Sequence, residues 1–411
     1  MLAMKFTPVL LLTIASIGEV PDETPLAEQV AHHYVELARQ RYEDSLDAAA
    51  ALNEAVQAFL NEPNATTHQA AKDAWVVAHS VYSHTEVFRF GNPNVDAWES
   101  RVNAWPMDEG LIDYVADGYV HHEGNVHARA NIIVEGRIPI TDEVLAAFMD
   151  GTDPKAAPLA SLGISDVESN VTRGYHAIEF LLWGQDLNEE RGQAGQRPFT
   201  DYVEGDDCTN GRCDRRRRYL SAVCRLLMRD LEFAIRDWDA NGRLYAKVFN
   251  ALPIAERLER MIVGVGTLSY GELAIERMQV AFLTSDQEEE QSCFSDATHH
   301  AHYHNALSIQ TTYLGRHARQ NGKRIEGPSI SDLVAAVEPE LDARIRKELE
   351  ASIALAQELV RVAEAGEPFD VMTAADNVEG RKRIQSLMNA LQQQTESLDL
   401  VKALVPKLAE L

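Results

Sequence analysis

The chain has 411 residues, with 64 acidic and 38 basic side chains and a formal net charge of -26. This length exceeds what one ordinary hydrophobic core supports, so two domains are expected. Such an acidic chain repels phosphate backbones and anionic lipid surfaces, which argues against nucleic acid as a partner, and it favours cations.

The N-terminus is typical of an export signal. Lys5 precedes an apolar run at 6–17, which is too short for a permanent membrane span but suits a signal-peptide core. We therefore expect residues 1–18 to be a signal peptide. The mature protein would be exported to the periplasm or cell envelope, without stable insertion in the membrane.

The four cysteines fit an oxidising compartment. Cys208 and Cys213 flank the turn-like sequence T-N-G-R, which a small disulfide could close. Cys224 and Cys293 would then either pair or stay free. A zinc site is the less favoured alternative, because it would need closer pairs such as C-x-x-C.

The first half of the chain is mainly helical in pattern. Apolar residues recur at helical spacing from 24 to 59, and again from about 66 to 90, where Glu86 continues an otherwise apolar stripe. The segment 95–158 is less regular, with short helical pieces. A further helix is expected to begin at Ser165, where Glu168 completes a capping box, and to end at Gly184.

The second half follows a polar connection at 188–211 and is also helical in pattern, with expected helices at 219–238, 254–283 and along the tail 330–411. No stretch alternates with a period of two for long enough to form a sheet. The sequence therefore predicts an all-α fold. We expect two helical bundles with pseudo-twofold similarity, a domain at 22–190 and a domain at 212–411.

The expected helix around 175–183 is apolar on every face, which is the pattern of a helix buried all round. Its ionisable residues, His176 and Glu179, are three positions apart and therefore share a face. Burying both without a partner would be costly, so a metal, a substrate or another charged helix should meet them. The alternative is a His–Glu pair that satisfies itself within the core.

A metal at this pair would need further ligands. Arg89 and Arg277 each follow an acid on a core-like stripe, so we expect them to neutralise buried carboxylates or hold an anionic group. The four histidines between 299 and 304 could instead form a polar helix edge. The candidates for the remaining ligands are Glu86, Glu272, Glu276, Asp296, His299, His300, His302 and His304.

Several ordered blocks of sequence resemble the imelysin family. G-Y-H-A-I-E at 174–179 is similar to its G-x-H-x-x-E signature, and T-E-V-F-R at 85–89 to the end of one of its helices. E-R-M-Q-V-A-F at 276–282 also agrees. S-C-F-S-D-A-T-H at 292–299 especially resembles the iron-regulated protein A branch. The resemblance extends over nearly the whole chain after the signal peptide.

This resemblance implies an exported helical protein of two bundles, with its site in the cleft between them and a link to bacterial iron uptake. His176 and Glu179 would form the centre of the site, with Glu86 and Arg89 opposite. Asp296 and His299 would come from the second domain. The family was also described as peptidases, with the motif His and Glu as zinc ligands.

Three functions follow from these observations. The first is a periplasmic protein that binds iron or a similar ion and passes it to uptake components of the cell envelope. The second is a zinc peptidase in which Glu179 or Glu86 acts as the base. The third is a protein that binds a small molecule or a peptide without a metal.

Overall fold

The computed structural model describes residues 24–119, 124–136, 138–150, 167, 169–187, 191–240 and 244–411. The signal peptide expected at 1–18 lies outside these residues, and so does the capping box of Ser165 and Glu168. The first described helix begins beside the C-terminus, because Leu26 N donates to Leu411 O at 2.8 Å.

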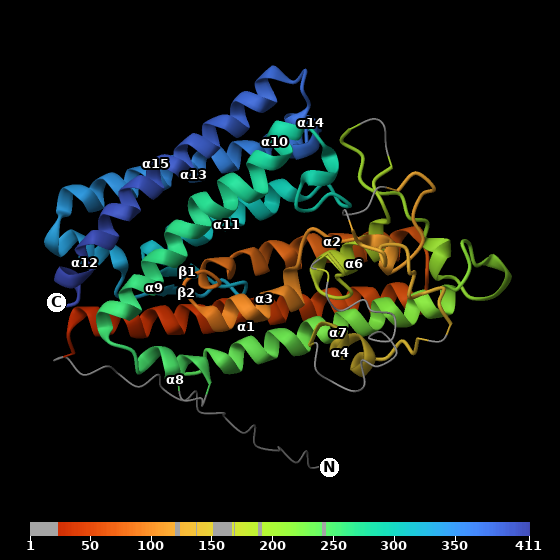
Figure 1. Ribbon diagram of the computed structural model, residues 1–411, viewed down its shortest axis with the longest axis horizontal. Helices are drawn as coiled ribbons and strands as arrows, with labels where there is room; N and C mark the ends of the chain where they lie inside the picture. Colours follow the sequence, from red (N-terminus) through yellow and green to blue (C-terminus); the bar gives the residue numbers. More distant parts are fainter. Residues whose placement is uncertain are drawn as a thin grey trace, which may run out of the picture.

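One layer of the molecule consists of three long helices, α1 (Leu26–Asn61), α2 (Ala65–Ser83) and α7 (Cys213–Asp237), which lie roughly along the longest axis (Figure 1). The turn between α1 and α2 is set by Asn64, whose side chain accepts from the backbone N–H groups of Thr66 and Thr67. Such a cap satisfies donors that a helix start leaves free. Helix α1 packs against both α2 and α7.

The second layer crosses the first at an angle (Figure 1). Its central rod runs through α9 (Ile254–Gly266), a π-helix (Thr267–Gln279) and α10 (Val280–Thr284). Helices α11 (Thr298–Tyr313) and α15 (Val378–Leu408) pack against this rod, and α13 (Pro339–Glu364) packs against both of them. A π-helix of this length is unusual, because most occur as single turns, often at functional sites.

Shorter elements complete the fold. They are α3 (Pro93–Asn103), α4 (Asp142–Asp150), α6 (Tyr175–Trp183), α8 (Tyr245–Asn250), α12 (Ile330–Val337), α14 (Phe369–Thr373) and 3-10 turns at Glu86–Phe88, Glu109–Leu111, Phe199–Tyr202, Gly205–Asp207 and Gln287–Glu289. The all-α fold predicted from the sequence is confirmed. The described residues add one small hairpin, β1 (Arg316–Ala318) with β2 (Arg324–Glu326), in which His317 pairs with Ile325. Strands of three residues are too short to show a period of two.

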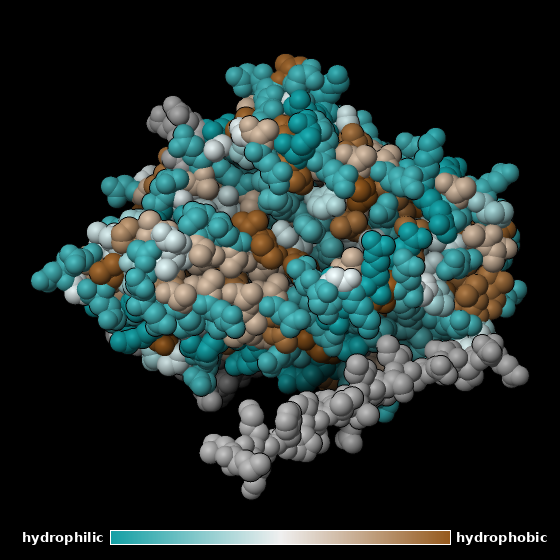
Figure 2. Space-filling model, turned by 180° about the vertical axis from the view of Figure 1, so that it is seen from behind, coloured by the Kyte–Doolittle hydropathy of each residue, from teal (hydrophilic) through white to brown (hydrophobic). Residues whose placement is uncertain are grey.

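Two hydrophobic cores hold the layers. The larger one joins α1, α2, α6, α7 and α9, so α7 packs with the N-terminal helices although it follows the connection at 188–211. The smaller one lies among the π-helix, α13, α14 and α15. A pseudo-twofold relation between 22–190 and 212–411 stays a prediction. The face of the molecule shown in Figure 2 is mostly hydrophilic.

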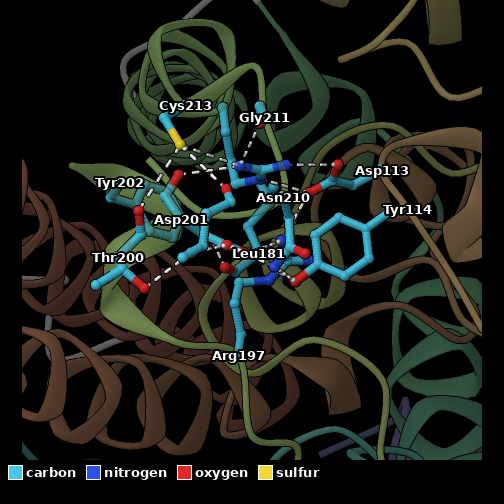
Figure 3. A network of polar contacts seen from close by, with 12 residues as sticks. Asp113, Tyr114, Leu181, Arg197, Thr200, Asp201, Tyr202, Asn210, Gly211 and Cys213 are labelled. Carbon is cyan, nitrogen blue, oxygen red and sulfur yellow. Dashed lines mark hydrogen bonds and ion pairs between the residues drawn. The ribbon is translucent and has the colours of Figure 1, made fainter. Parts of the chain in front are cut away.

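A buried ionic network fixes the segment that follows α6. Arg197 and Arg216 converge on the carboxylate of Asp113, each at 2.6 Å from Oδ2. Figure 3 shows Asp113 and Arg197 within this network. Tyr202 donates from its hydroxyl to Leu181 O, and Arg197 N donates to Trp183 O at 2.7 Å. The C-terminal end of α6 is therefore held by both side chains and backbone.

The predicted disulfide between Cys208 and Cys213 is present beside this network. Cys224 and Cys293 are buried and free, which resolves the alternative that the sequence left open. No helix among the described residues has both the length and the apolar composition needed to cross a bilayer.

Candidate functional site

Helix α6 carries His176 and Glu179 of the sequence G-Y-H-A-I-E and is buried along its whole length. It begins at Tyr175, so the prediction that the helix starts at Ser165 is wrong at least for 169–174, which are not helical. The reason is Gly174, which has a φ of 93° and lies so close to α3 that a Cβ would come within 2.5 Å of Val102 O. Only glycine fits this conformation and this approach, which explains the first position of the motif.

His176 and Glu179 bond to each other. His176 Nδ1 and Glu179 Oε2 are 2.8 Å apart, and neither side chain is exposed. The other oxygen of Glu179 accepts from Ser295 N at 3.0 Å and from Ser295 Oγ at 2.7 Å. His176 Nε2 is buried and has no hydrogen-bond partner. A carboxylate that holds one ring nitrogen while the other stays free is the usual support of a metal-binding histidine.

The charge state of this pair is set by burial. Loss of solvent lowers the pKa of His176 to about 3 and raises the pKa of Glu179 to about 8, although the Ser295 hydroxyl bond lowers the latter. Both groups thus favour their neutral forms near neutral pH. A cation at Nε2 would favour ionised Glu179, so metal binding should release a proton.

Glu86 lies beside this pair but is fully engaged. Its carboxylate accepts from Arg277 at 2.5 and 2.8 Å, from Asn305 at 2.5 Å and from Asn103 at 2.9 Å. Burial would raise the pKa of Glu86, but the charge and hydrogen bonds of Arg277 lower it to about 2. Glu86 is therefore an ionised carboxylate that the protein itself neutralises, which is a role that the sequence had suggested for Arg277.

The π-helix positions the remaining charged candidates. Glu272 accepts from Arg277 Nη2 at 2.7 Å and lies 3.6 Å from Arg89. Arg89 also donates to Asp96 at 2.9 Å. Glu276 is exposed, so it does not continue a core-like stripe with Glu272 as an α-helical count suggests. The wider i→i+5 winding changes which residues share a face.

Asp296 belongs to a different group of charges. One ligand oxygen each of Glu290, Asp296 and Asp370 lies within 4.8 Å of the others, and all three residues are buried. Burial and then the neighbouring charge of Asp370 raise the pKa of Asp296 to about 8. Asp296 follows Ser295, the residue that binds Glu179, so one loop connects the acidic group with the His176–Glu179 pair.

The histidines expected near Asp296 take separate positions on α11. His299 and His302 are buried, and His299 Nδ1 and both ring nitrogens of His302 lack hydrogen-bond partners. Burial lowers the pKa of each to about 3, so both are neutral imidazoles. His304 Nδ1 lies 2.8 Å from His84 Nε2 instead. His300 is partly buried.

The structure thus brings the predicted residues together in three groups rather than around one point. His176 pairs with Glu179, Glu86 with Arg277, and Asp296 with two acids that the sequence did not single out. Within the described part of the chain, Glu290, Asp296 and Asp370 form the one such group of three that meets the distance for a shared ion. Glu290 ends an acidic run at 288–290 that carries no local signal for a site, and Asp370 is brought to it by the fold.

A cavity of about 550 Å³ adjoins the same loop, between the segments 105–119 and 286–294. Its walls include Trp105, Asp108, Glu109 and Phe294. Phe294 also packs on Phe180 of α6, with ring centroids 5.4 Å apart. The acids in its wall attract cations rather than anions.

Comparison with known proteins places the chain in a family. A structure of a candidate iron-regulated protein A precursor from Parabacteroides distasonis has a TM-score of 0.65 and 18% identity, and the match covers 94% of this chain and 96% of that one. An imelysin-like protein from Psychrobacter arcticum has a TM-score of 0.57 and 15% identity, over 90% and 93% of the two chains. At these identities the likeness shows the fold.

The sequence comparisons are more specific. Iron-regulated protein A from Synechococcus elongatus is 34% identical over 64 residues, a segment that covers 15% of this chain and 18% of that protein. The family model described as imelysin matches residues 38–398. Because this match takes in most of the chain, the protein belongs to the imelysin family.

Proposed function

We propose that this protein is an exported metal-binding protein that takes iron or a similar ion at His176. The observation that carries the proposal is the free Nε2 of His176, buried beside a carboxylate that fixes the ring through Nδ1. His176 would donate its lone pair to the ion, and Glu179 would orient the imidazole and accept charge. A bound ion supplies Lewis acidity and charge at this point.

Export and a role in iron uptake belong to the same proposal. The Parabacteroides relative is named as a precursor, and the Synechococcus relative as iron-regulated. The disulfide between Cys208 and Cys213 suits an oxidising compartment outside the cytoplasm. We propose that the protein holds its ion in the periplasm or cell envelope and passes it to uptake components there.

A zinc peptidase gains no support from the geometry. Such an enzyme needs a base apart from the metal ligands. Of the two carboxylates expected to serve, Glu86 is held by Arg277, Asn305 and Asn103, and Glu179 by His176 and Ser295. Each of the two carboxylates proposed as the base of a peptidase is therefore already engaged in hydrogen bonds within the protein.

Metal titration of chelator-treated protein tests the proposal. Isothermal titration with Fe²⁺ and with Zn²⁺ should show a saturable binding event that is lost in His176→Ala. Glu179→Gln should weaken it by about 10- to 100-fold, because Glu179 acts through the histidine. His32→Ala changes an exposed histidine on α1 and is the matched control. Unchanged affinity in His176→Ala, or no saturable binding of either ion by the wild-type protein, would overturn the proposal.

A further inference from the structure

Glu290, Asp296 and Asp370 converge from three separate segments of the chain. Glu290 and Asp296 lie on the loop between α10 and α11, and Asp370 lies in α14. One oxygen from each lies within 4.8 Å of the other two. Ligands of a calcium-sized ion bond at about 2.3–2.6 Å, so two oxygens on one ion are at most about 5 Å apart. The three oxygens therefore fit around a single ion.

These carboxylates are buried without the partners that buried charges require. Glu290 and Asp370 are each 1% exposed, and Asp296 is 8% exposed. Neither oxygen of Glu290 has a hydrogen-bond partner, and Oδ1 of both Asp296 and Asp370 lacks one as well. The Thr298 hydroxyl lowers the pKa of Glu290 without completing a hydrogen bond of good geometry. Buried polar groups in native proteins are almost always satisfied, so these free oxygens call for a ligand.

The neighbouring guanidinium of Arg191 does not supply the missing partner of these carboxylate oxygens. Arg191 donates to the main-chain oxygen of Asp370 at 2.5 Å and to Ser285 O, so its hydrogen bonds leave the carboxylate free. Oδ2 of Asp370 accepts from Gly192 N at 2.6 Å, whereas Oδ1 has no hydrogen-bond partner among the described residues. Burial and the charges of Asp296 and Asp370 hold the pKa of Glu290 well above its usual range. A positive charge placed among the three would remove this repulsion.

We infer that Glu290, Asp296 and Asp370 form a second site that binds a hard cation of charge +2 or +3 through oxygen alone. The ligand set decides the class, because carboxylates suit hard ions such as Ca²⁺ and Mn²⁺, whereas imidazole suits Zn²⁺, Cu²⁺, Fe²⁺ and Ni²⁺. Each carboxylate gives one oxygen, and waters complete the shell. This site is distinct from His176 and does not depend on the function proposed there.

A cation at this site also has a structural effect. It would tie the loop that carries Ser295 to α14, which otherwise meet across free carboxylates. Since Ser295 donates to Glu179, filling the acidic site would stiffen the support of the His176–Glu179 pair. Binding that favours the folded state also raises its stability by mass action.

Calorimetry with Ca²⁺, and Mn²⁺ binding followed by electron paramagnetic resonance, tests the site in the full-length protein after chelator treatment. The wild-type protein should bind one ion, and its thermal midpoint should rise when Ca²⁺ is added. Glu290→Gln and Asp296→Asn should each weaken binding at least about tenfold, because affinity follows the ligand charge count. His176→Ala should keep full binding of Ca²⁺.

Glu289→Gln is the matched control, since it removes an acid next to Glu290 that is not part of the trio, and it should bind like the wild type. Loss of binding in Glu289→Gln equal to that in Glu290→Gln would assign the effect to general charge and overturn the site. Full affinity in both trio variants would also overturn it. If the variants fail to fold, the wild-type protein decides: the lack of any Ca²⁺- or Mn²⁺-dependent rise in its thermal midpoint contradicts the proposal.

Discussion

Glu86 and Glu290 are the same residue type with the same exposure, 1% each, yet their surroundings differ in every other respect. The carboxylate of Glu86 accepts four hydrogen bonds, two of them from a buried arginine. The carboxylate of Glu290 accepts none and faces two further acids. Burial alone therefore does not identify a metal site. The two residues differ in their partners, since Arg277 forms an ion pair with Glu86, whereas no arginine or lysine of the described residues forms one with Glu290.

The largest expected effect comes from removing that internal positive charge. Arg277→Met should lower the free energy of unfolding by about 3–5 kcal/mol, because Glu86 would stay buried and uncompensated. Urea denaturation at pH 7 measures this loss. Adding Glu86→Leu to Arg277→Met should recover most of the loss, since replacing both partners removes the unpaired charge.

The half-exposed pair of Arg225 with Asp142 provides a control for this comparison. Arg225→Met should change the free energy of unfolding by no more than about 1 kcal/mol, as is usual for surface pairs. A loss in Arg277→Met no larger than that in Arg225→Met would show that the buried ion pair is not what balances Glu86.

The second effect is a pH dependence. The pKa of Glu86 is lowered from 4.5 to about 2 in the folded protein, so its contribution to stability is complete above pH 4.5 and is lost as the pH falls from 4.5 to 2. That contribution is about 3 kcal/mol at about 1.4 kcal/mol per pKa unit. The stability difference between wild type and Glu86→Gln should therefore shrink between pH 5 and pH 3 in urea titrations. A difference that stays constant over this range would contradict the assignment.

The smallest of these effects is a rise in the free energy of unfolding rather than a loss. In the presence of chelator at pH 7, Glu290→Gln should raise the free energy of unfolding by roughly 1–3 kcal/mol, because burial among acids holds the pKa of Glu290 well above its usual range, and glutamine avoids the cost of taking up a proton on folding. Urea denaturation with and without chelator measures it. A loss of stability in Glu290→Gln without any cation present would mean that Glu290 is balanced from within, as Glu86 is.

The centre of the candidate site could be predicted from the sequence because its signals are local. His176 and Glu179 share one helical face in an apolar segment, and the structure places both at zero exposure on α6. Gly184 was correctly expected at the end of that helix. The all-α class follows in the same way from periodicity, which is local and repeated along the chain.

The other features of the fold and of the site depend on contacts between distant segments, which the periodicity of the sequence does not encode. Gly174 ends the loop before α6 because of Val102, which lies in a different helix. Glu276 turns outward because the segment winds as a π-helix, and an α-helical count cannot detect that. Glu290 and Asp370 are 80 positions apart, and only packing of α14 against α10 near the loop makes them neighbours.

The π-helix also has a consequence for how insertions and deletions would act in this protein. Thr267–Gln279 is wound more widely than the α-helices on either side. Deleting one residue ahead of Arg277, with the winding unchanged, would turn Arg277 by up to about 100° about the axis, which is the advance of one residue in an α-helix. Arg277 would then leave Glu86 although its identity is unchanged. The position of this guanidinium is thus encoded by a residue count, so that a single-codon deletion could abolish it while every side chain of the site is retained.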